Sequence, residues 1–184
     1  MIASRMVLAA AVVAMSAAPA KTQQPTHTYV IVHGAWGGGW DWRHVDSLLT
    51  AAGNRVHRPT LTGLGERVHL LTPAVDLSTH ITDIVNVIRF ENLRDVVLVG
   101  HSYGGMVISG VADRIPDRIR HVVYLDAFVP EDGESVLTAM RGSPGERFVR
   151  GLIDSAKNDA IVPAWVPPGA NPPSDVPHPK RSFA

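Results

Sequence analysis

The chain has no cysteine in its 184 residues, so disulfide bonds, thiolate nucleophiles and zinc–sulfur sites are excluded. It also lacks an excess of charge, because 17 Lys and Arg residues balance 17 Asp and Glu residues. The charge balance therefore gives no indication of a nucleic-acid partner or of an anionic membrane surface. Hydrophobic residues make up 45% of the chain, and its length suffices for one globular domain but is short for two.

The first 20 residues have the pattern of a secretory signal peptide. Arg5 precedes an apolar run over residues 6–15, and Ala18-Pro19-Ala20 supplies the small residues typical of a cleavage site. The apolar run is too short to span a bilayer. We therefore expect cleavage after residue 20, a secreted or periplasmic protein, and no stable membrane anchor after cleavage. An uncleaved anchor or a misassigned start codon is the alternative.

Strand-like and helix-like segments alternate from Tyr29 to Phe128, after a polar lead over residues 21–28. The predicted strands are TYVIVHG, NRVHRPTL, DVVLVG and RHVVYLDAF, with an amphipathic helix between each pair. This strict alternation is the signature of an α/β domain with an open parallel sheet and helices on both faces. We assign residues 29–129 to this core.

The pattern changes beyond Pro130, where two or three short helices are predicted. A proline-rich stretch follows, in which seven of the 17 residues from Pro163 to Pro179 are proline. Such a density of proline is incompatible with regular helix or sheet and predicts an extended segment. Residues 130–184 are therefore expected to form a helical and proline-rich region with an extended tail.

A serine stands at the end of the strongest predicted strand. Gly100-His101-Ser102-Tyr103-Gly104 fits the nucleophile-elbow pattern G-x-S-x-G, in which a serine occupies a strained strand-to-helix turn. Small residues are required at Gly100 and Gly104, because strand and helix approach closely there. Ser102 is therefore the predicted catalytic nucleophile, and a plain turn with an incidental serine is the alternative.

A glycine-rich turn, HGAWGGGWDW over residues 33–42, follows the first predicted strand. Such a turn can aim a backbone N–H at the same point as the N–H of the residue after the nucleophile, forming an oxyanion hole. The predicted donors are the backbone amides of Ala35 and Tyr103. A phosphate-binding role is disfavoured because the Gly-Lys-Ser/Thr ending of a Walker motif is missing.

Together these motifs resemble the α/β-hydrolase superfamily, in particular its plant methylesterases, hydroxynitrile lyases and bacterial aryl- and pyrethroid-type esterases. The resemblance rests on VIVHGAWGGGWDW, AAGNRVHRPTLTGLGERVHLL, LVGHSYGGMV and VVYLDAFVPEDGES. It implies strands in the spatial order second, first, third, fourth, and a cap after Pro130 over the pocket. It also implies hydrolysis of a small-molecule carboxyl ester by Ser102, with no cofactor. No metal site is expected, because the histidines show no H-E-x-x-H or comparable ligand spacing.

The resemblance further implies an acid and a histidine on loops after two additional strands. No apolar β-branched run after Leu125 could form either strand, so neither partner is assigned to a position in this sequence. We therefore expect a C-terminally truncated, partial α/β-hydrolase fold whose last strands are missing and whose activity is absent or impaired. His178, between two prolines near the C-terminus, is expected to be a solvated tail residue.

Three further residues near the predicted site are candidates for supporting roles. Asp126 closes the fourth predicted strand and could act as the acid in a variant arrangement, although an acid orients a histidine and does not replace one. His33 is expected to brace the glycine-rich turn by hydrogen bonds. His101 is expected to point away from the serine and to have a structural or pocket-edge role.

Two alternatives to an esterase stay open. A hydroxynitrile-lyase-like enzyme would use the same serine and oxyanion turn, and a non-catalytic remnant would bind small apolar ligands or a partner subunit. The last predicted strand, RHVVYLDAF, would form an exposed apolar edge of the sheet. Such edges pair readily with other chains, so self-association through this edge is expected.

Overall fold

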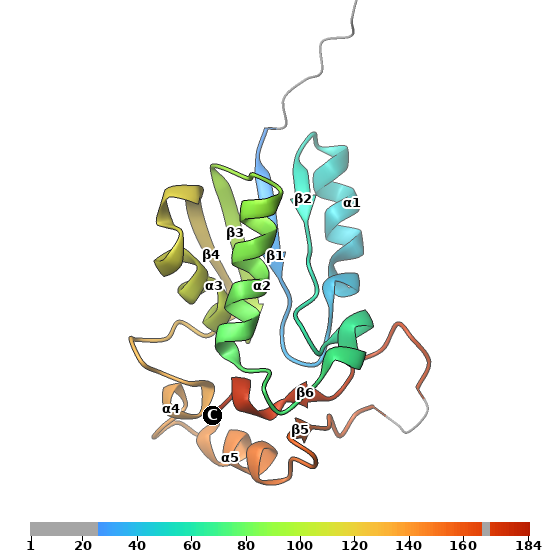
Figure 1. Cartoon of the computed structure of the whole chain (residues 1–184), viewed down its shortest axis with the longest axis vertical. Coiled ribbons are helices and arrows are strands. Elements are labelled where there is room, and N and C mark those ends of the chain that lie inside the picture. Colours follow the sequence, from blue (N-terminus) through green and yellow to red (C-terminus); the bar gives the residue numbers. More distant parts are fainter. Residues whose placement is uncertain (1–25, 167–169) are drawn as a thin grey trace, which may run out of the picture.

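A computed structural model describes residues 26–166 and 170–184 (Figure 1). The predicted signal peptide lies outside the described residues. Within the described part of the chain, no helix is both long enough and apolar enough to cross a membrane.

A parallel sheet, four-stranded in the described residues, lies at the centre of the fold. Its strands are β1 (Thr28–Val32), β2 (Arg55–His57), β3 (Val96–Ser102) and β4 (Ile119–Ala127). Their order is β2-β1-β3-β4, which confirms the order implied by the family resemblance. The chain crosses from one side of β1 to the other between β2 and β3. The carboxyl ends of β1 and β3 therefore flank the crevice where open α/β sheets bind ligands.

Helices connect the strands as the alternating pattern predicts (Figure 1). The connecting elements are η1 (Gly39–Trp42), α1 (Arg43–Ala51), η2 (Gly65–Leu70), α2 (Leu77–Phe90), α3 (Gly104–Arg114) and η3 (Pro116–Arg118). Helix α2 begins at Asp76, whose carboxylate accepts a hydrogen bond from the Thr79 amide at 2.9 Å. This capping satisfies one of the amides that a helix N-terminus leaves without a partner.

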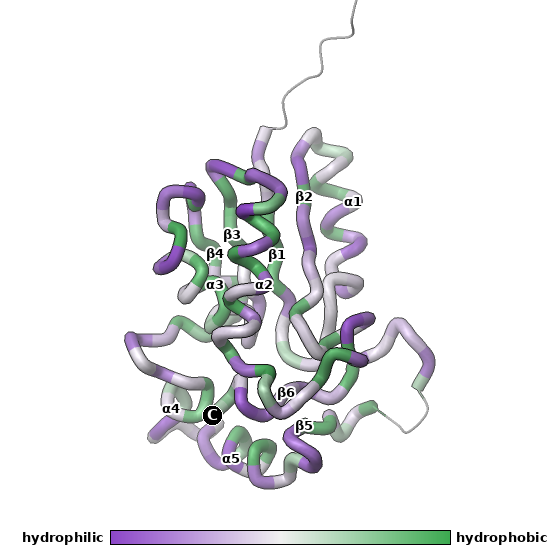
Figure 2. Tube along the Cα trace, in the orientation of Figure 1, coloured by the Kyte–Doolittle hydropathy of each residue, from purple (hydrophilic) through white to green (hydrophobic). Residues whose placement is uncertain are grey.

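The hydrophobic core lies where α2 and α3 pack together against the sheet, and hydrophobic residues line β1 and β3 (Figure 2). Its members on these elements with no exposed surface are Val30, Val32, Ile84, Ile88, Val96, Leu98, Val107, Ile108 and Val111. They recur at helical spacing on α2 and α3 and at alternate positions on the strands, as burial of one face requires. The core fixes β3 and α3 relative to each other, and therefore the turn between them.

The β4 strand is an exposed edge of the sheet, as predicted. Val123 and Leu125 are 40% and 45% exposed. The Tyr124 hydroxyl between them bonds to Ser109 Oγ of α3 at 2.8 Å, so the two flanking side chains point away from α3. In the described residues, β4 has no strand on its outer side. The strand therefore presents both unpaired backbone groups and apolar side chains.

Residues after Pro130 gather beyond the carboxyl ends of the strands (Figure 1). They form α4 (Val136–Ala139), α5 (Glu146–Asp154), β5 (Ala160–Ile161), β6 (His178–Pro179) and η4 (Lys180–Ser182). The expectation of an extended segment without sheet is wrong at its C-terminal end, because His178 and Pro179 form β6, which pairs antiparallel with β5. Pro179 fits this short edge pair, since an edge strand does not require every backbone N–H.

Candidate active site

Ser102 occupies a strained turn between β3 and α3. Its backbone φ is +52°, in the left-handed region that costs a non-glycine residue about 1–3 kcal/mol. Two glycines allow the turn to form. A Cβ on Gly100 would lie 2.7 Å from the Gly104 carbonyl oxygen, and a Cβ on Gly104 would lie 2.6 Å from that of Val32. Both distances are shorter than carbon–oxygen contact allows, so the geometry of the G-x-S-x-G pattern is present at these positions.

The glycine-rich turn after β1 is braced by a buried histidine. The Nδ1–H of His33 donates to the Gly34 carbonyl oxygen at 2.8 Å, and its Nε2 accepts from the Leu61 amide at 3.1 Å. Burial lowers the pKa of His33 to about 4, so the ring is neutral near pH 7. The expectation that His33 braces this turn is confirmed.

The turn and the serine are in contact. A Cβ built on Gly34 would lie 3.3 Å from Cβ of Ser102. Ala35, one residue further on, and Tyr103, which follows the serine, each carry a backbone N–H at this junction. Across residues 26–166 and 170–184, neither of these two amides donates a hydrogen bond. Neither N–H group is therefore engaged by another residue that the structure describes.

Ser102 opens into a shallow hollow of about 210 Å³, which it lines with Asp126, Ala127 and Phe128. The Phe128 amide donates to the Ser102 carbonyl oxygen at 3.1 Å and holds the two segments together. Asp126 is exposed and also has a positive φ, of 45°. In the described part of the chain, no histidine ring bonds to Ser102 Oγ or to the Asp126 carboxylate. The structure thus brings the serine and the candidate acid to one hollow without a base between them.

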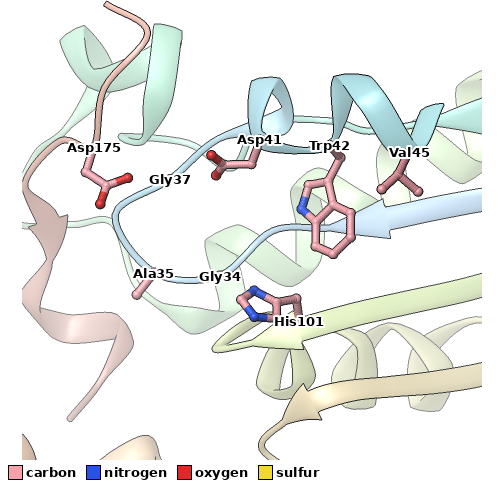
Figure 3. Close-up of a pocket in the computed structure, with 8 residues that line it drawn as sticks. All are labelled: Gly34, Ala35, Gly37, Asp41, Trp42, Val45, His101 and Asp175. Atoms are coloured by element: carbon pink, nitrogen blue, oxygen red, sulfur yellow. The ribbon is translucent and has the colours of Figure 1, made fainter. Parts of the chain in front are cut away.

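A second cavity, of about 360 Å³, is lined in part by residues of the glycine-rich turn (Figure 3). His101 faces it and packs edge-on against Trp42, with ring centroids 5.8 Å apart. The Asp41 carboxylate accepts from the Gly38 amide at 3.1 Å, and burial raises its pKa. His101 thus lies at the edge of this cavity and does not line the hollow into which Ser102 opens. The cavity is lined by Gly34, Ala35, Gly37, Asp41, Trp42, Val45, His101 and Asp175.

The expectation that His178 is a solvated tail residue is wrong. The residue has no exposed surface, and its Nδ1 accepts a hydrogen bond from the Trp36 amide at 3.3 Å. Its Nε2 bonds to Ser182 Oγ at 2.7 Å. Burial, together with the nearby His80 and His33, lowers its pKa well below the usual value. The pairing of β5 with β6 draws this segment inward, a long-range effect that the proline-rich pattern did not reveal.

Tyr103 links the elbow to a further buried histidine. The Thr62 carbonyl oxygen accepts from His80 Nε2 at 2.9 Å, so His80 Nδ1 carries no proton and accepts from the Tyr103 hydroxyl at 2.8 Å. Burial raises the pKa of Tyr103, which keeps its hydroxyl protonated. Sequence reasoning missed both His80 and Ser182. Neither lies in a motif, and no local signal distinguishes them from core and tail residues.

A serine on a strand–turn–helix elbow, beside a glycine-rich turn at the same edge of a parallel sheet, is the arrangement that defines an α/β hydrolase. The family model described as "Alpha/beta hydrolase family" matches residues 29–183, and the chain belongs to this family.

Similar proteins include several esterases. The chain is 57% identical over 112 residues to a carbendazim hydrolyzing esterase of Nocardioides sp. (strain SG-4G), a match covering 61% of this chain and 46% of that protein. It is 33% identical over 106 residues to salicylic acid-binding protein 2 of Nicotiana tabacum, covering 56% and 40%. A solved extracellular α/β-hydrolase from a Paenibacillus species superposes with a TM-score of 0.67 at 32% identity, covering 74% and 55%. The chain spans about half the length of the curated relatives it matches.

Proposed function

We propose that this chain carries the nucleophile and the oxyanion-binding groups of a carboxyl-ester hydrolase. The observation that carries the proposal is the left-handed Ser102 at the elbow, in contact with the glycine-rich turn. The similar esterase from Nocardioides supports the reaction class. The acyl and alcohol parts of the ester are not specified by these features.

In this proposal, Ser102 Oγ attacks the ester carbonyl carbon and the carbonyl oxygen becomes negatively charged. The Ala35 and Tyr103 amides donate hydrogen bonds to that oxygen. Loss of one such donor typically costs about 10²–10³ in kcat, so this pair would supply much of the rate enhancement. Collapse of the tetrahedral intermediate expels the alcohol and leaves an acyl group on Ser102, which water then removes.

The reaction needs a base for the serine proton, and none bonds to Ser102 in the described residues. His178 does not serve, because both its ring nitrogens are engaged by other groups. We therefore propose that the 184-residue chain by itself is inactive or strongly impaired, since loss of triad members lowers kcat by about 10⁴–10⁶. Asp126 lines the same hollow as Ser102 and would orient a base that enters this hollow.

Chemical rescue tests this proposal. Imidazole added in solution can take the serine proton where the protein supplies no base, so it should accelerate hydrolysis of p-nitrophenyl acetate by the purified chain. Ser102→Ala at equal concentration is the control and corrects for hydrolysis by imidazole itself. We expect a rate difference between the two proteins that is close to zero without imidazole and grows with its concentration. Equal rates at every imidazole concentration would contradict the role of Ser102. A large Ser102-dependent rate without imidazole would contradict the proposed impairment.

A lyase is the second candidate, because the chain is 33% identical over 107 residues to an alpha-hydroxynitrile lyase of Arabidopsis thaliana, covering 57% of this chain and 41% of that protein. The serine and the oxyanion turn suit either reaction. Release of cyanide from mandelonitrile, measured beside ester hydrolysis under the same rescue conditions, discriminates between them.

Two properties of the whole protein complete the proposal. The first is export through the signal peptide over residues 1–20, supported by the extracellular Paenibacillus neighbour. The second is self-association through β4, supported by the exposure of Val123 and Leu125 on this unpaired strand.

A further inference from the structure

Trp36, which follows the proposed oxyanion donor Ala35, has a strained backbone. Its φ is +65°, and the Gly37 amide donates to the Ala35 carbonyl oxygen at 2.8 Å. A hydrogen bond from the amide of one residue to the carbonyl oxygen two residues earlier, with a positive φ at the residue between them, defines the rare and strained form of the γ-turn. Relaxation of Trp36 would rotate the peptide that joins it to Ala35. The Ala35 N–H belongs to the preceding peptide, but this rotation would displace Cα of Ala35 and with it that N–H. The position of the Ala35 N–H therefore depends on what holds Trp36 in place.

Residues far along the chain hold Trp36. Its amide donates to His178 Nδ1 at 3.3 Å, and its carbonyl oxygen accepts from the Val176 amide at 2.9 Å. Its indole Nε1–H donates to the Ile161 carbonyl oxygen at 3.2 Å. All three partners lie on the β5–β6 pair or directly before β6. The segment after α5 thus satisfies both backbone groups and the side chain of the strained residue.

The tautomer of His178 is set by its second partner. Ser182 Oγ donates its own hydrogen to the Pro179 carbonyl oxygen at 2.8 Å, so it accepts from His178 Nε2. Nδ1 is then left with a lone pair, which points at the Trp36 amide. The buried ring therefore acts as an acceptor at one nitrogen and a donor at the other, and a proton on Nδ1 would break the contact with Trp36.

The same ring also contacts the second proposed oxyanion donor. The His178 and Tyr103 rings pack edge-on with centroids 4.8 Å apart. The hydrogen bond from the Tyr103 hydroxyl to His80 prevents the tyrosine from turning away. His178 thus contacts both Trp36, which follows Ala35, and Tyr103.

We infer that His178 is a positioning residue of the oxyanion hole, which holds the turn at Trp36 in its strained conformation and sets the spacing between the Ala35 and Tyr103 amides. This inference rests on the proposed function, because it assigns His178 a role toward the two proposed oxyanion donors. The ring acts through the Trp36 amide and takes no proton from Ser102.

A matched pair of substitutions distinguishes the role of His178 as hydrogen-bond acceptor for Trp36 from a purely space-filling role of its ring. Asn places its side-chain oxygen where His178 has Nδ1, so His178→Asn retains the acceptor for Trp36. Gln places its amide where the ring has Nε2, so His178→Gln retains a partner for Ser182 and puts a methylene group opposite Trp36. Both variants lose the aromatic ring, and unfolding by urea measures that common loss.

The first readout is independent of activity. Hydrogen exchange of the assigned Trp36 backbone amide, followed by NMR on the full chain, reports whether its hydrogen bond persists. We expect protection near that of the parent in His178→Asn and exchange at least about tenfold faster in His178→Gln. Equal exchange in the two variants would overturn the inference. If His178→Gln does not fold, Ser182→Ala replaces it, because freeing Nε2 lets the ring change tautomer and should also speed Trp36 exchange. Unchanged exchange in Ser182→Ala would then count against the inference.

The second readout is the imidazole-rescued, Ser102-dependent hydrolysis of p-nitrophenyl acetate. We expect kcat to fall about 10–100-fold in His178→Gln with little change in KM, and to stay within about threefold of the parent in His178→Asn. Equal kcat in both variants would overturn the link to the oxyanion hole. Failure of rescue in the parent would overturn the proposed function, whereas Trp36 exchange would still decide whether His178 holds the turn.

Discussion

The backbone amide of Trp36 donates a hydrogen bond to the ring of His178, which lies 142 residues further along the chain. This contact joins the glycine-rich turn after β1 to the short β5–β6 pair. It places a segment with the composition of a loose tail against the backbone that is proposed to bind an oxyanion. The conformation of that turn therefore depends on residues at both ends of the described chain.

Substitution of Gly104 tests the close approach at the elbow. In Gly104→Ala, the new Cβ would lie 2.6 Å from the Val32 carbonyl oxygen, so we expect a loss of about 1–3 kcal/mol in the free energy of unfolding. Gly151→Ala in α5 is the control, because a Cβ there meets nothing within 4 Å, and it should raise stability by up to about 1 kcal/mol. Urea unfolding measures both. Shifts of the same sign and size would contradict the steric argument.

The stability of the protein should fall on acidification. His33 has a folded-state pKa of about 4, lowered by burial from 6.5, so the unfolded chain binds the proton more tightly. The contribution of His33 to the free energy of unfolding is complete above pH 6.5. It declines as the pH falls below 6.5 and is lost near pH 4, a change of about 3 kcal/mol. Buried His80 and His178 shift in the same direction.

Urea unfolding at intervals from pH 7.5 to pH 4 measures this dependence. His33→Asn removes the titrating ring and keeps a side-chain donor for the Gly34 carbonyl oxygen, so its stability should vary less with pH. His44→Asn on exposed α1 is the matched substitution. An identical slope in the His33 and His44 variants would refute the assignment.

Because β4 is an exposed edge strand, we expect the protein to self-associate through it. Two charged side chains introduced on this strand should suppress that association. Val123→Lys combined with Leu125→Lys places two charges on the exposed side of the strand, which disfavours pairing of edges. We expect the parent to sediment as dimers or larger species at micromolar concentration and the double variant as a monomer. Phe148→Lys is the control, because Phe148 is 61% exposed on α5, away from β4. A monomeric parent, or equal relief by Phe148→Lys, would argue against this edge.

The signal peptide predicts a processed N-terminus. Expressed in a bacterium with an intact secretion pathway, the chain should be recovered from the periplasm or medium with Lys21 as its first residue, as measured by intact mass. Ala20→Phe places a large side chain at the predicted cleavage position and should leave the N-terminal segment attached. A parent that retains Met1 would contradict the prediction.

The elbow could be recognised from the sequence because its determinants are local. Gly100, Ser102 and Gly104 lie within five residues, and the apolar strand before them and the helix after them follow from periodicity alone. The bracing role of His33 could also be anticipated, because the residue adjoins the turn it supports. Exposure of β4 followed from counting the predicted strands once the family resemblance had given their order.

His178 could not be placed in this way. Its flanking prolines are typical of an exposed tail, and β5 and β6 contain two residues each, too few for any periodic pattern. Its burial results from contacts with Trp36, Tyr103 and Ser182, which belong to three separate segments. The sequence by itself determined the α/β class, the strained serine and the glycine-rich turn, since each rests on neighbouring residues. Tertiary structure alone decided which side chain holds that turn, because a hydrogen bond between residues 142 positions apart forms only when the intervening chain has folded.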